Sequence, residues 1–274
     1  ITGSAGSERS QSSSSMSLPL LALESITKTF RRSGGALVNA VRGVSLDIGH
    51  GETLALVGES GSGKSTLGRI ALGLLRPDAG RVLLEGRPLD DMSGARLRHE
   101  RVAVQPIFQD AGASLNPRRS AAELLGQALR LSRDGKGRRD VVRRSLELLE
   151  SVGLRPARDY LERYPHELSG GQRQRLAIAR ALAMEPSLIV ADEPLSGADV
   201  SIRGQILNLL MDIKEKRGVA YLMITHDISI ARAFADRVAV MMQGEIVEQG
   251  EARTVLASPA QAYTKRLVAA VPAL

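Results

Sequence analysis

One nine-residue stretch constrains this chain more than any other. Residues 58–66 read Gly58-Glu59-Ser60-Gly61-Ser62-Gly63-Lys64-Ser65-Thr66 and fit the pattern G-x-x-x-x-G-K-[ST] of a phosphate-binding loop. Residues 53–57 before it form a short apolar run that is typical of a buried strand, and residues 67–75 after it have helical spacing. This strand–loop–helix context predicts a phosphate-binding loop and argues against a Gly/Ser-rich turn that matches by chance.

The residue types of this loop explain how it would hold an anion. Its glycines allow the backbone to curl, so that successive N–H groups point at phosphate oxygens. The helix that follows offers its N-terminus to the same anion. We expect Lys64 to reach the outer phosphates and Ser65 to place its hydroxyl on Mg²⁺.

Composition allows a large core but excludes several kinds of site. The chain has 274 residues, of which 43% are hydrophobic and 24% are charged, enough for one large domain or two lobes. It contains no Cys, which excludes disulfides, thiolate metal sites and cysteine-held clusters. No apolar run approaches the roughly 18 residues that a membrane span needs. We therefore expect a soluble protein, or one that reaches a membrane through a partner.

The net charge of +7 has two interpretations. It could indicate binding to nucleic acid, or it could reflect arginines spread over the surface together with attraction to an acidic membrane. The chain has no Trp, three Phe and four Tyr, so side chains on which bases could stack are scarce. The second interpretation is favoured, and we expect no nucleic-acid partner.

The N-terminal third begins with a segment that we exclude from the fold. Residues 1–15 are rich in Ser and Gly, cannot bury enough apolar surface to order themselves, and are interpreted as a linker before Met16. Residues 20–30 and 37–48 alternate like antiparallel strands. Phe30 ends the first of them, where its ring could stack on an adenine base or simply pack on the sheet.

The middle of the chain predicts helices inserted into an α/β frame. Residues 81–85 and 101–108 read as strands, and Pro106 places the second at an edge or a bulge because it lacks a backbone donor. Helical spacing follows over residues 121–131 and 140–152.

The second half places polar groups where strands end and helices begin. Ser169-Gly170-Gly171 precedes a helical run and predicts a second anion site at a helix N-terminus. The apolar run from 187 delivers Asp192 and Glu193, carboxylates suited to Mg²⁺ and to polarising water. The strand at 221–225 ends in His226, at a sheet edge where α/β sites gather their ligands. A hairpin at 237–248 and an amphipathic helix at 259–270 complete the prediction.

In order and spacing, these motifs resemble the ATP-binding-cassette (ABC) family. The segments that carry the resemblance are 58–65, Gln109, 168–172, Asp192-Glu193 and His226. The signature Leu-Ser-Gly-Gly-Gln is intact at 168–172, and the resemblance covers about residues 20–250. Segments 108–110, 113–118, 164–168 and 262–272 look most similar to the oligopeptide, dipeptide and nickel importer branch.

The resemblance implies a role for each matching residue, with ATP and Mg²⁺ as cofactors. Ser65, Gln109 and Asp192 would be metal ligands, and Gln109 would also sense the γ-phosphate and the docked membrane subunit. Glu193 would be the general base and His226 would contact the γ-phosphate. The residues expected to bind nucleotide are Gly58, Glu59, Ser60, Gly61, Ser62, Gly63, Lys64, Ser65, Thr66, Phe30, Ser169, Gly170, Gly171, Gln172 and Asp199. Ala198 stands where the family usually has a Leu, which affects how this segment packs across a dimer.

The resemblance also implies a fold and a set of partners. It implies a P-loop NTPase (RecA-like) α/β core over about residues 18–110 and 176–250, with an antiparallel β subdomain. A helical subdomain would occupy about 111–175 and a C-terminal tail 251–274, all within one ATPase domain, 16–274. The implied partners are membrane-spanning permease subunits, a second ATPase subunit and, indirectly, a solute-binding protein. For the second subunit, a related but different ATPase is favoured over another copy of this chain. The protein would lie peripherally on the cytoplasmic face of the inner (plasma) membrane.

The function implied is ATP hydrolysis that powers import of oligopeptides, dipeptides or nickel. One alternative is an ABC-type ATPase subunit of a soluble complex, in phosphonate metabolism, DNA repair or translation. A second is a regulatory nucleotide binder without activity, which the intact Glu193 and His226 argue against.

Overall fold

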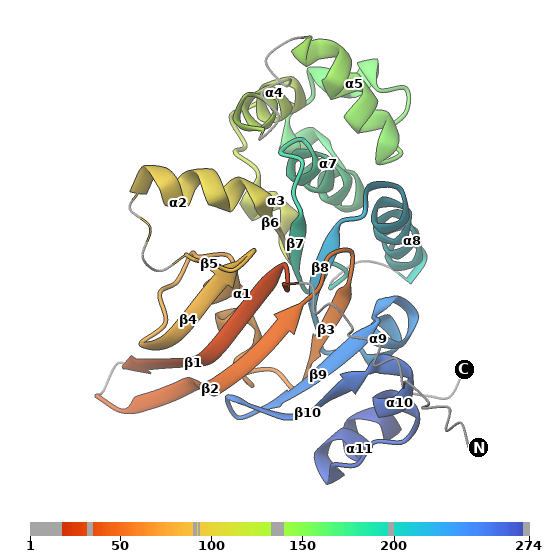
Figure 1. Cartoon of the computed structure of the whole chain (residues 1–274). Coiled ribbons are helices and arrows are strands. Elements are labelled where there is room, and N and C mark those ends of the chain that lie inside the picture. Colours follow the sequence, from red (N-terminus) through yellow and green to blue (C-terminus); the bar gives the residue numbers. More distant parts are fainter. Residues whose placement is uncertain are drawn as a thin grey trace, which may run out of the picture.

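Two β-sheets form the frame of the part of the chain that the computed structural model describes, namely residues 18–31, 35–89, 92, 94–132, 140–196 and 200–270 (Figure 1). A four-stranded antiparallel sheet has the order β2-β1-β4-β5, and a six-stranded sheet has the order β10-β9-β3-β8-β7-β6. The strands are β1 (Leu21–Arg31), β2 (Leu37–Ile48), β3 (Thr53–Val57), β4 (Ala79–Leu84), β5 (Arg87–Pro88), β6 (Val104–Phe108), β7 (Leu188–Asp192), β8 (Ala220–Thr225), β9 (Arg237–Met242) and β10 (Glu245–Glu251).

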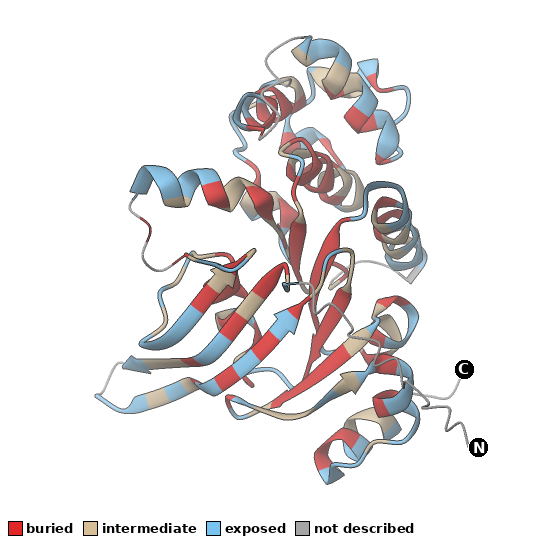
Figure 2. Cartoon of the chain, viewed as in Figure 1, coloured by how far each residue is buried: buried red, intermediate tan, exposed pale blue. Residues whose placement is uncertain are grey.

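The six-stranded sheet is parallel from β9 to β6, and only β10 runs antiparallel to its neighbour. Every residue of β3 and β8 is buried, which is expected where helices cover both faces of a parallel sheet (Figure 2). Alternate residues of β7 enter different cores, because successive side chains on a strand point to opposite faces. Leu188 and Val190 pack with helix α1, whereas Ile189 and Ala191 pack with helices α7 and α8.

Helices lie on both sides of this sheet. They are α1 (Lys64–Ala71), α2 (Gly94–Glu100), α3 (Ala111–Ser114), α4 (Ala121–Leu131), α5 (Val141–Ser151), α6 (Arg158–Leu161), α7 (Gly170–Leu182), α8 (Val200–Arg217), α9 (Ile228–Phe234), α10 (Ala252–Ala257) and α11 (Ala262–Ala269), with 3₁₀ turns η1 (Arg101–Ala103) and η3 (Pro165–Glu167). In the described part of the chain, none of these helices combines the length and apolar character that a membrane span requires.

Helices α4 and α5 form a separate upper layer with α7 (Figure 1). Leu125, Leu129 and Leu149 are fully buried in the core that these helices share. The helical insertion expected from the sequence is therefore present between β6 and the strands that follow α7. The α/β fold class with an antiparallel β region is likewise confirmed.

Several predicted bounds need correction. The first helix does not run over residues 67–75: it begins at Lys64 and ends at Ala71. Gly73 adopts a φ of 62°, a left-handed conformation that terminates a helix readily. The 18-residue helix α8 had no counterpart in the sequence analysis. Pro106 does lie on an edge strand, β6, as expected.

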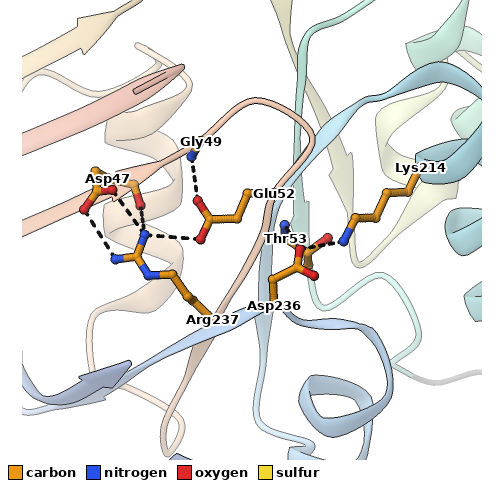
Figure 3. A network of polar contacts seen from close by, with 7 residues as sticks. All are labelled: Asp47, Gly49, Glu52, Thr53, Lys214, Asp236 and Arg237. Atoms are coloured by element: carbon orange, nitrogen blue, oxygen red, sulfur yellow. Dashed lines mark hydrogen bonds and ion pairs between the residues drawn. The ribbon is translucent and has the colours of Figure 1, made fainter. Parts of the chain in front are cut away.

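A network of charged side chains joins the two sheets at the end of β3 away from the phosphate loop (Figure 3). The Arg237 guanidinium lies 3.1 Å from Asp47 of β2 and 3.2 Å from Glu52. Next to it, Asp236 accepts hydrogen bonds from the backbone N–H of Thr53 and from Lys214 of α8, at 2.7 and 2.6 Å. These contacts tie the start of β9 to β2 of the four-stranded sheet, to β3 and to helix α8.

Candidate functional site

The predicted phosphate loop connects β3 to α1, as its pattern requires. Gly63 is the N-cap of α1 and has a φ of 109°. A Cβ atom on Gly63 would lie 2.1 Å from the backbone oxygen of Ala40, and one on Gly58 would lie 2.1 Å from that of Met241. Both positions therefore require glycine for space as well as for conformation.

Lys64 lies inside this loop and is buried, with 5% of its surface exposed. Its ammonium donates hydrogen bonds of 2.8 Å to the backbone oxygens of Gly58 and Glu59. Burial lowers the pKa of Lys64, although the nearby carboxylates of Glu193 and Asp192 act in the opposite direction. The Lys64 ammonium is thus a desolvated cation held within the phosphate loop.

Ser65 and Asp192 meet beside Lys64, although they are far apart in the sequence. The Ser65 hydroxyl donates to the Asp192 carboxylate over 3.0 Å, because α1 begins where strand β7 ends. Burial raises the pKa of Asp192, while the hydrogen bond from Ser65 partly offsets that effect. A hydroxyl and a carboxylate side by side are the oxygen donors that suit Mg²⁺.

Glu193 and His226 also come together. The His226 Nδ1 atom lies 3.1 Å from a Glu193 carboxylate oxygen, with His226 following β8 and Glu193 following β7. Glu193 has a φ of 47°, and its N–H donates to the backbone oxygen of Ile224. This unusual backbone conformation turns the Glu193 side chain toward the phosphate loop.

A cavity of about 390 Å³ lies against Lys64, Ser65 and Glu193, and Asp192 and His226 adjoin it through their contacts with Ser65 and Glu193. Its lining comes from the phosphate loop and α1, from Glu193, from strand β2, and from the turn between β9 and β10. The lining residues are Val38, Asn39, Ala40, Arg42, Ser60, Gly61, Gly63, Lys64, Ser65, Thr66, Glu193 and Gln243. The sequence analysis did not anticipate the contributions of β2 and Gln243, which follow only from the packing of the two sheets.

Four further predicted residues line a second cavity of about 390 Å³. It contains Gln109, Ser169, Gly170 and Gly171, and the Gln109 side chain donates to the Ser196 hydroxyl over 3.1 Å. The two cavities share no lining residue. Within one chain, therefore, neither Gln109 nor the 169–171 segment lines the phosphate-loop cavity.

The N-terminus of α7 is closed by a capping box and lies at the surface. Ser169 caps the helix by accepting from the N–H of Gln172, and the Gln172 side chain accepts from the N–H of Ser169. This leaves other N–H groups of the first turn without a helical partner. Ser169 and Gly170 are exposed, so these donors can face a ligand from outside the chain.

Several predicted residues, Phe30 among them, line neither cavity. Phe30 has 41% of its surface exposed and pairs across the sheet with Val38, which lines the first cavity. Its ring lies 5.8 Å from the Lys28 ammonium. Asp199, like the predicted linker 1–15, lies outside the described residues.

Comparison with known proteins decides which family this arrangement represents. Residues 41–196, more than half of the chain, match the sequence model of the ABC transporter family. The chain belongs to the ABC transporter family. The matched range contains the phosphate loop, Gln109, the 168–172 signature and both carboxylates at the end of β7, so the family resemblance seen in the sequence is confirmed.

Curated ABC relatives include proteins named for glutathione import. The chain is 49% identical over 235 residues to the glutathione import ATP-binding protein GsiA of Salmonella paratyphi A. It is 46% identical over 260 residues to the protein of that name from Escherichia coli K12. These alignments cover 86% and 93% of this chain but only 37% and 41% of the relatives.

Solved structures of ABC proteins share the fold. The ATP-binding cassette MJ0796, in a dimeric post-hydrolysis state bound to ADP and Pi, matches with a TM-score of 0.75 and 32% identity. That alignment covers 85% of this chain and 99% of the other. CbiO1 from Clostridium perfringens, part of the transporter complex cbiONQ, matches with a TM-score of 0.73 and 30% identity over 88% and 91% of the two chains. The fold is therefore that of an ABC ATPase cassette.

Proposed function

We propose that this chain binds and hydrolyses ATP and thereby powers an ABC importer. One observation carries the proposal: Lys64, Ser65 and Glu193 line one phosphate-loop cavity, and Asp192 and His226 contact Ser65 and Glu193 at 3.0 and 3.1 Å. The relatives named for glutathione import favour small peptides as the cargo within the oligopeptide, dipeptide and nickel branch.

The first step is the binding of the nucleotide phosphates. The loop N–H groups, Lys64 and the N-terminus of α1 would hold the phosphate oxygens. Ser65 and Asp192 would hold Mg²⁺, which supplies positive charge that stabilises the transferring phosphoryl group. Phe30 would lie near the adenine base of the nucleotide, because its cross-strand neighbour Val38 lines the cavity.

Glu193 is the group we assign as general base. Its carboxylate lies beside the cavity and can accept a proton from a water molecule aligned with the γ-phosphate. His226 holds that carboxylate through its 3.1 Å contact and would reach the γ-phosphate with its other ring nitrogen. The chain itself therefore positions the base and accepts the proton.

A second ATPase subunit would complete the site. Because residues 169–171 do not line the phosphate-loop cavity of their own chain, the exposed N-terminus of α7 would reach a phosphate on another subunit. The γ-phosphate would then be contacted by Ser169, Gly170, Gly171, Gln172 and Asp199 of the other subunit. As the dimer closes, the Gln109 side chain would move toward the metal ion. We favour a related heterodimer partner over a homodimer.

The partners and boundaries follow from the importer proposal. The chain would lie on the cytoplasmic face of the membrane, dock on permease subunits, and act on a solute-binding protein indirectly. We assign residues 18–110 and 176–250 to the ATPase core and β subdomain, 111–175 to the helical subdomain, and 251–274 to a tail. An ATPase subunit of a soluble complex is the alternative; capture of metabolic enzymes in place of permeases from native membranes would support it.

The substitution Glu193→Gln tests the assignment of the base. We expect ATP binding to persist, hydrolysis to fall by about 100-fold or more, and a closed dimer to accumulate with ATP. ATPase assays and size-exclusion chromatography measure these effects. Glu185→Gln is the matched control, since Glu185 also has a positive φ but pairs with Arg144 far from the cavity. Hydrolysis by Glu193→Gln at the unmutated rate would remove Glu193 from this role.

A further inference from the structure

We propose that the C-terminal helix α11 positions the phosphate loop through the hydroxyl of Tyr263, so that this tail sets the affinity for nucleotide. The proposal rests on the ATP binding proposed above. It concerns a residue outside the 41–196 family match. The sequence predicts a helix at 259–270 around this residue but does not connect it to the site.

The first observation is a hydrogen bond between the tail and the loop. The backbone N–H of Glu59 donates to the Tyr263 hydroxyl over 3.0 Å, across 204 positions of sequence. Tyr263 is 6% exposed, and its ring packs in a core with Ala55 and Val57 of β3. The ring is thus anchored on the strand that carries the loop, and its hydroxyl faces the first peptide of the loop.

The second observation concerns the other side of that peptide. The N–H of Glu59 and the C=O of Gly58 belong to one planar peptide group. That C=O accepts a 2.8 Å hydrogen bond from the Lys64 ammonium. Tyr263, the peptide and Lys64 therefore form a continuous chain of hydrogen bonds, in which the hydroxyl fixes the orientation of the peptide that holds the lysine.

The third observation is that α11 itself is held in place. The Glu248 carboxylate of β10 accepts from the N–H groups of Ala260 and Gln261, at 2.7 and 3.1 Å. This carboxylate lies at the N-terminus of α11, where negative charge is favoured. In Figure 1 the helix lies below β9 and β10, next to α10. The tail is thus tied to the sheet at one end and to the loop through Tyr263.

The Tyr263 hydroxyl, and not its ring, is the group that orients the Gly58–Glu59 peptide. Without it the ring still fills its core site, but the Gly58–Glu59 peptide loses its partner and can rotate. Such rotation would move the Gly58 carbonyl that holds Lys64 and misalign the N–H groups of the loop. Tyr263 is therefore a positioning residue: its loss should weaken ATP binding more than it slows turnover.

The test compares Tyr263→Phe with Tyr221→Phe in the full chain. Tyr221 is the matched control, because it is also buried and its hydroxyl donates to the backbone oxygen of Leu210, away from the cavity. Titration with a fluorescent ATP analogue gives Kd, steady-state hydrolysis gives KM and kcat, and thermal unfolding gives Tm. For Tyr263→Phe we expect Kd and KM to rise about 3- to 10-fold, the effect of one lost hydrogen bond, with kcat within about twofold. Tyr221→Phe should lower Tm and leave Kd unchanged.

Three results would contradict the proposal, and they are distinguishable. If Tyr263→Phe binds the analogue as tightly as the unmutated chain, the hydroxyl does not position the loop. If both variants weaken binding equally, the effect is one of general stability. If the unmutated chain itself fails to bind the analogue, the proposed function falls, and this inference with it. A second variant, Glu248→Gln, should raise Kd in the same direction by loosening α11.

Discussion

At the scale of single residues, the site keeps charges where water is scarce. Burial lowers the pKa of Lys64 and raises the pKa of Asp192, and in each case the shift disfavours the charged form. Under the proposed function both groups act only when charged, since Lys64 would attract phosphate and Asp192 would hold a cation. The charged forms of Lys64 and Asp192 therefore lower the stability of the fold, which is a common cost of a binding site.

The substitution Asp192→Asn should separate stability from function. It keeps an oxygen that accepts from Ser65 but removes a buried charge next to Glu193. Without nucleotide, we expect Tm to rise, whereas Mg²⁺-dependent hydrolysis should fall by about 100-fold or more. Differential scanning calorimetry and ATPase assays over a Mg²⁺ series measure the two effects.

Asp78→Asn is the control for that experiment. Asp78 is an exposed carboxylate whose pKa is lowered by the hydrogen bond from Lys28, so its charge is favourable in the folded state. We expect its replacement to leave hydrolysis unchanged and to lower Tm slightly or not at all. An Asp192→Asn variant that hydrolyses ATP with unaltered Mg²⁺ dependence would show that Asp192 does not hold the metal.

At the scale of secondary-structure elements, two helices begin with the same device. Ser120 starts α4 and Ser169 starts α7, each in a capping box with the third helical residue. The local hydrogen bonds are alike, but the surroundings differ. Ser120 is 4% exposed inside the helical layer, whereas Ser169 is exposed at the second cavity.

This pair allows capping to be separated from catalysis. Ser120→Ala and Ser169→Ala should each lower the free energy of unfolding by about 1 kcal/mol, because each loses an N-cap oxygen. Only Ser169→Ala should also reduce ATP hydrolysis, by about tenfold or more, since only this hydroxyl can contact a phosphate on another subunit. Urea unfolding and ATPase assays provide the comparison. Equal losses of hydrolysis in the two variants would indicate that Ser169 acts through helix stability alone.

At the scale of the whole molecule, the two sheets must keep a fixed relation because both line the phosphate-loop cavity. Strand β2 contributes Val38 and Ala40, and the turn after β9 contributes Gln243. The Arg237 network holds β9 to β2 at the opposite end of the same strands (Figure 3). Loss of this network should therefore weaken ATP binding at the cavity as well as lower the free energy of unfolding.

Arg237→Ala tests this coupling between the sheets. It removes the guanidinium that contacts Asp47 and leaves the half-buried Glu52 without that partner. We expect a loss of about 1–2 kcal/mol in the free energy of unfolding, together with weaker ATP binding. Lys216→Ala is the control: its i,i+4 pair with Asp212 is exposed, so a loss of about 0.5 kcal/mol or less and unchanged binding are expected. Normal stability of Arg237→Ala would mean that the interface is held by packing alone.

The sequence alone determined the chemistry and the frame of this protein. The phosphate loop, the carboxylates after β7 and the 168–172 signature are local patterns, because each depends on a strand end or a helix start that a few neighbouring residues specify. The strand at 37–48 and the helix at 121–131 were also predicted with the observed bounds. The helix has a strong apolar period, and the apolar residues of the strand alternate over 44–48, although burial skips from Val41 to Val44 where the pairing with β1 shifts register. Family membership followed from the order of these motifs.

Only the tertiary structure decided how those local patterns meet. Helix α8 was missed because it is apolar on several sides, and α1 was placed too late because Lys64 and Ser65 carry no apolar signal. The division of the predicted residues between two cavities and the lining from β2 depend on segments that are distant in the sequence. The hydrogen bond from Glu59 to Tyr263 joins residues 204 positions apart. No local pattern encodes such pairs, since they depend on how strands are ordered in the sheets and on where the tail packs. The sequence thus names the candidate groups of the site, and the packing of the whole chain determines which of them line one cavity.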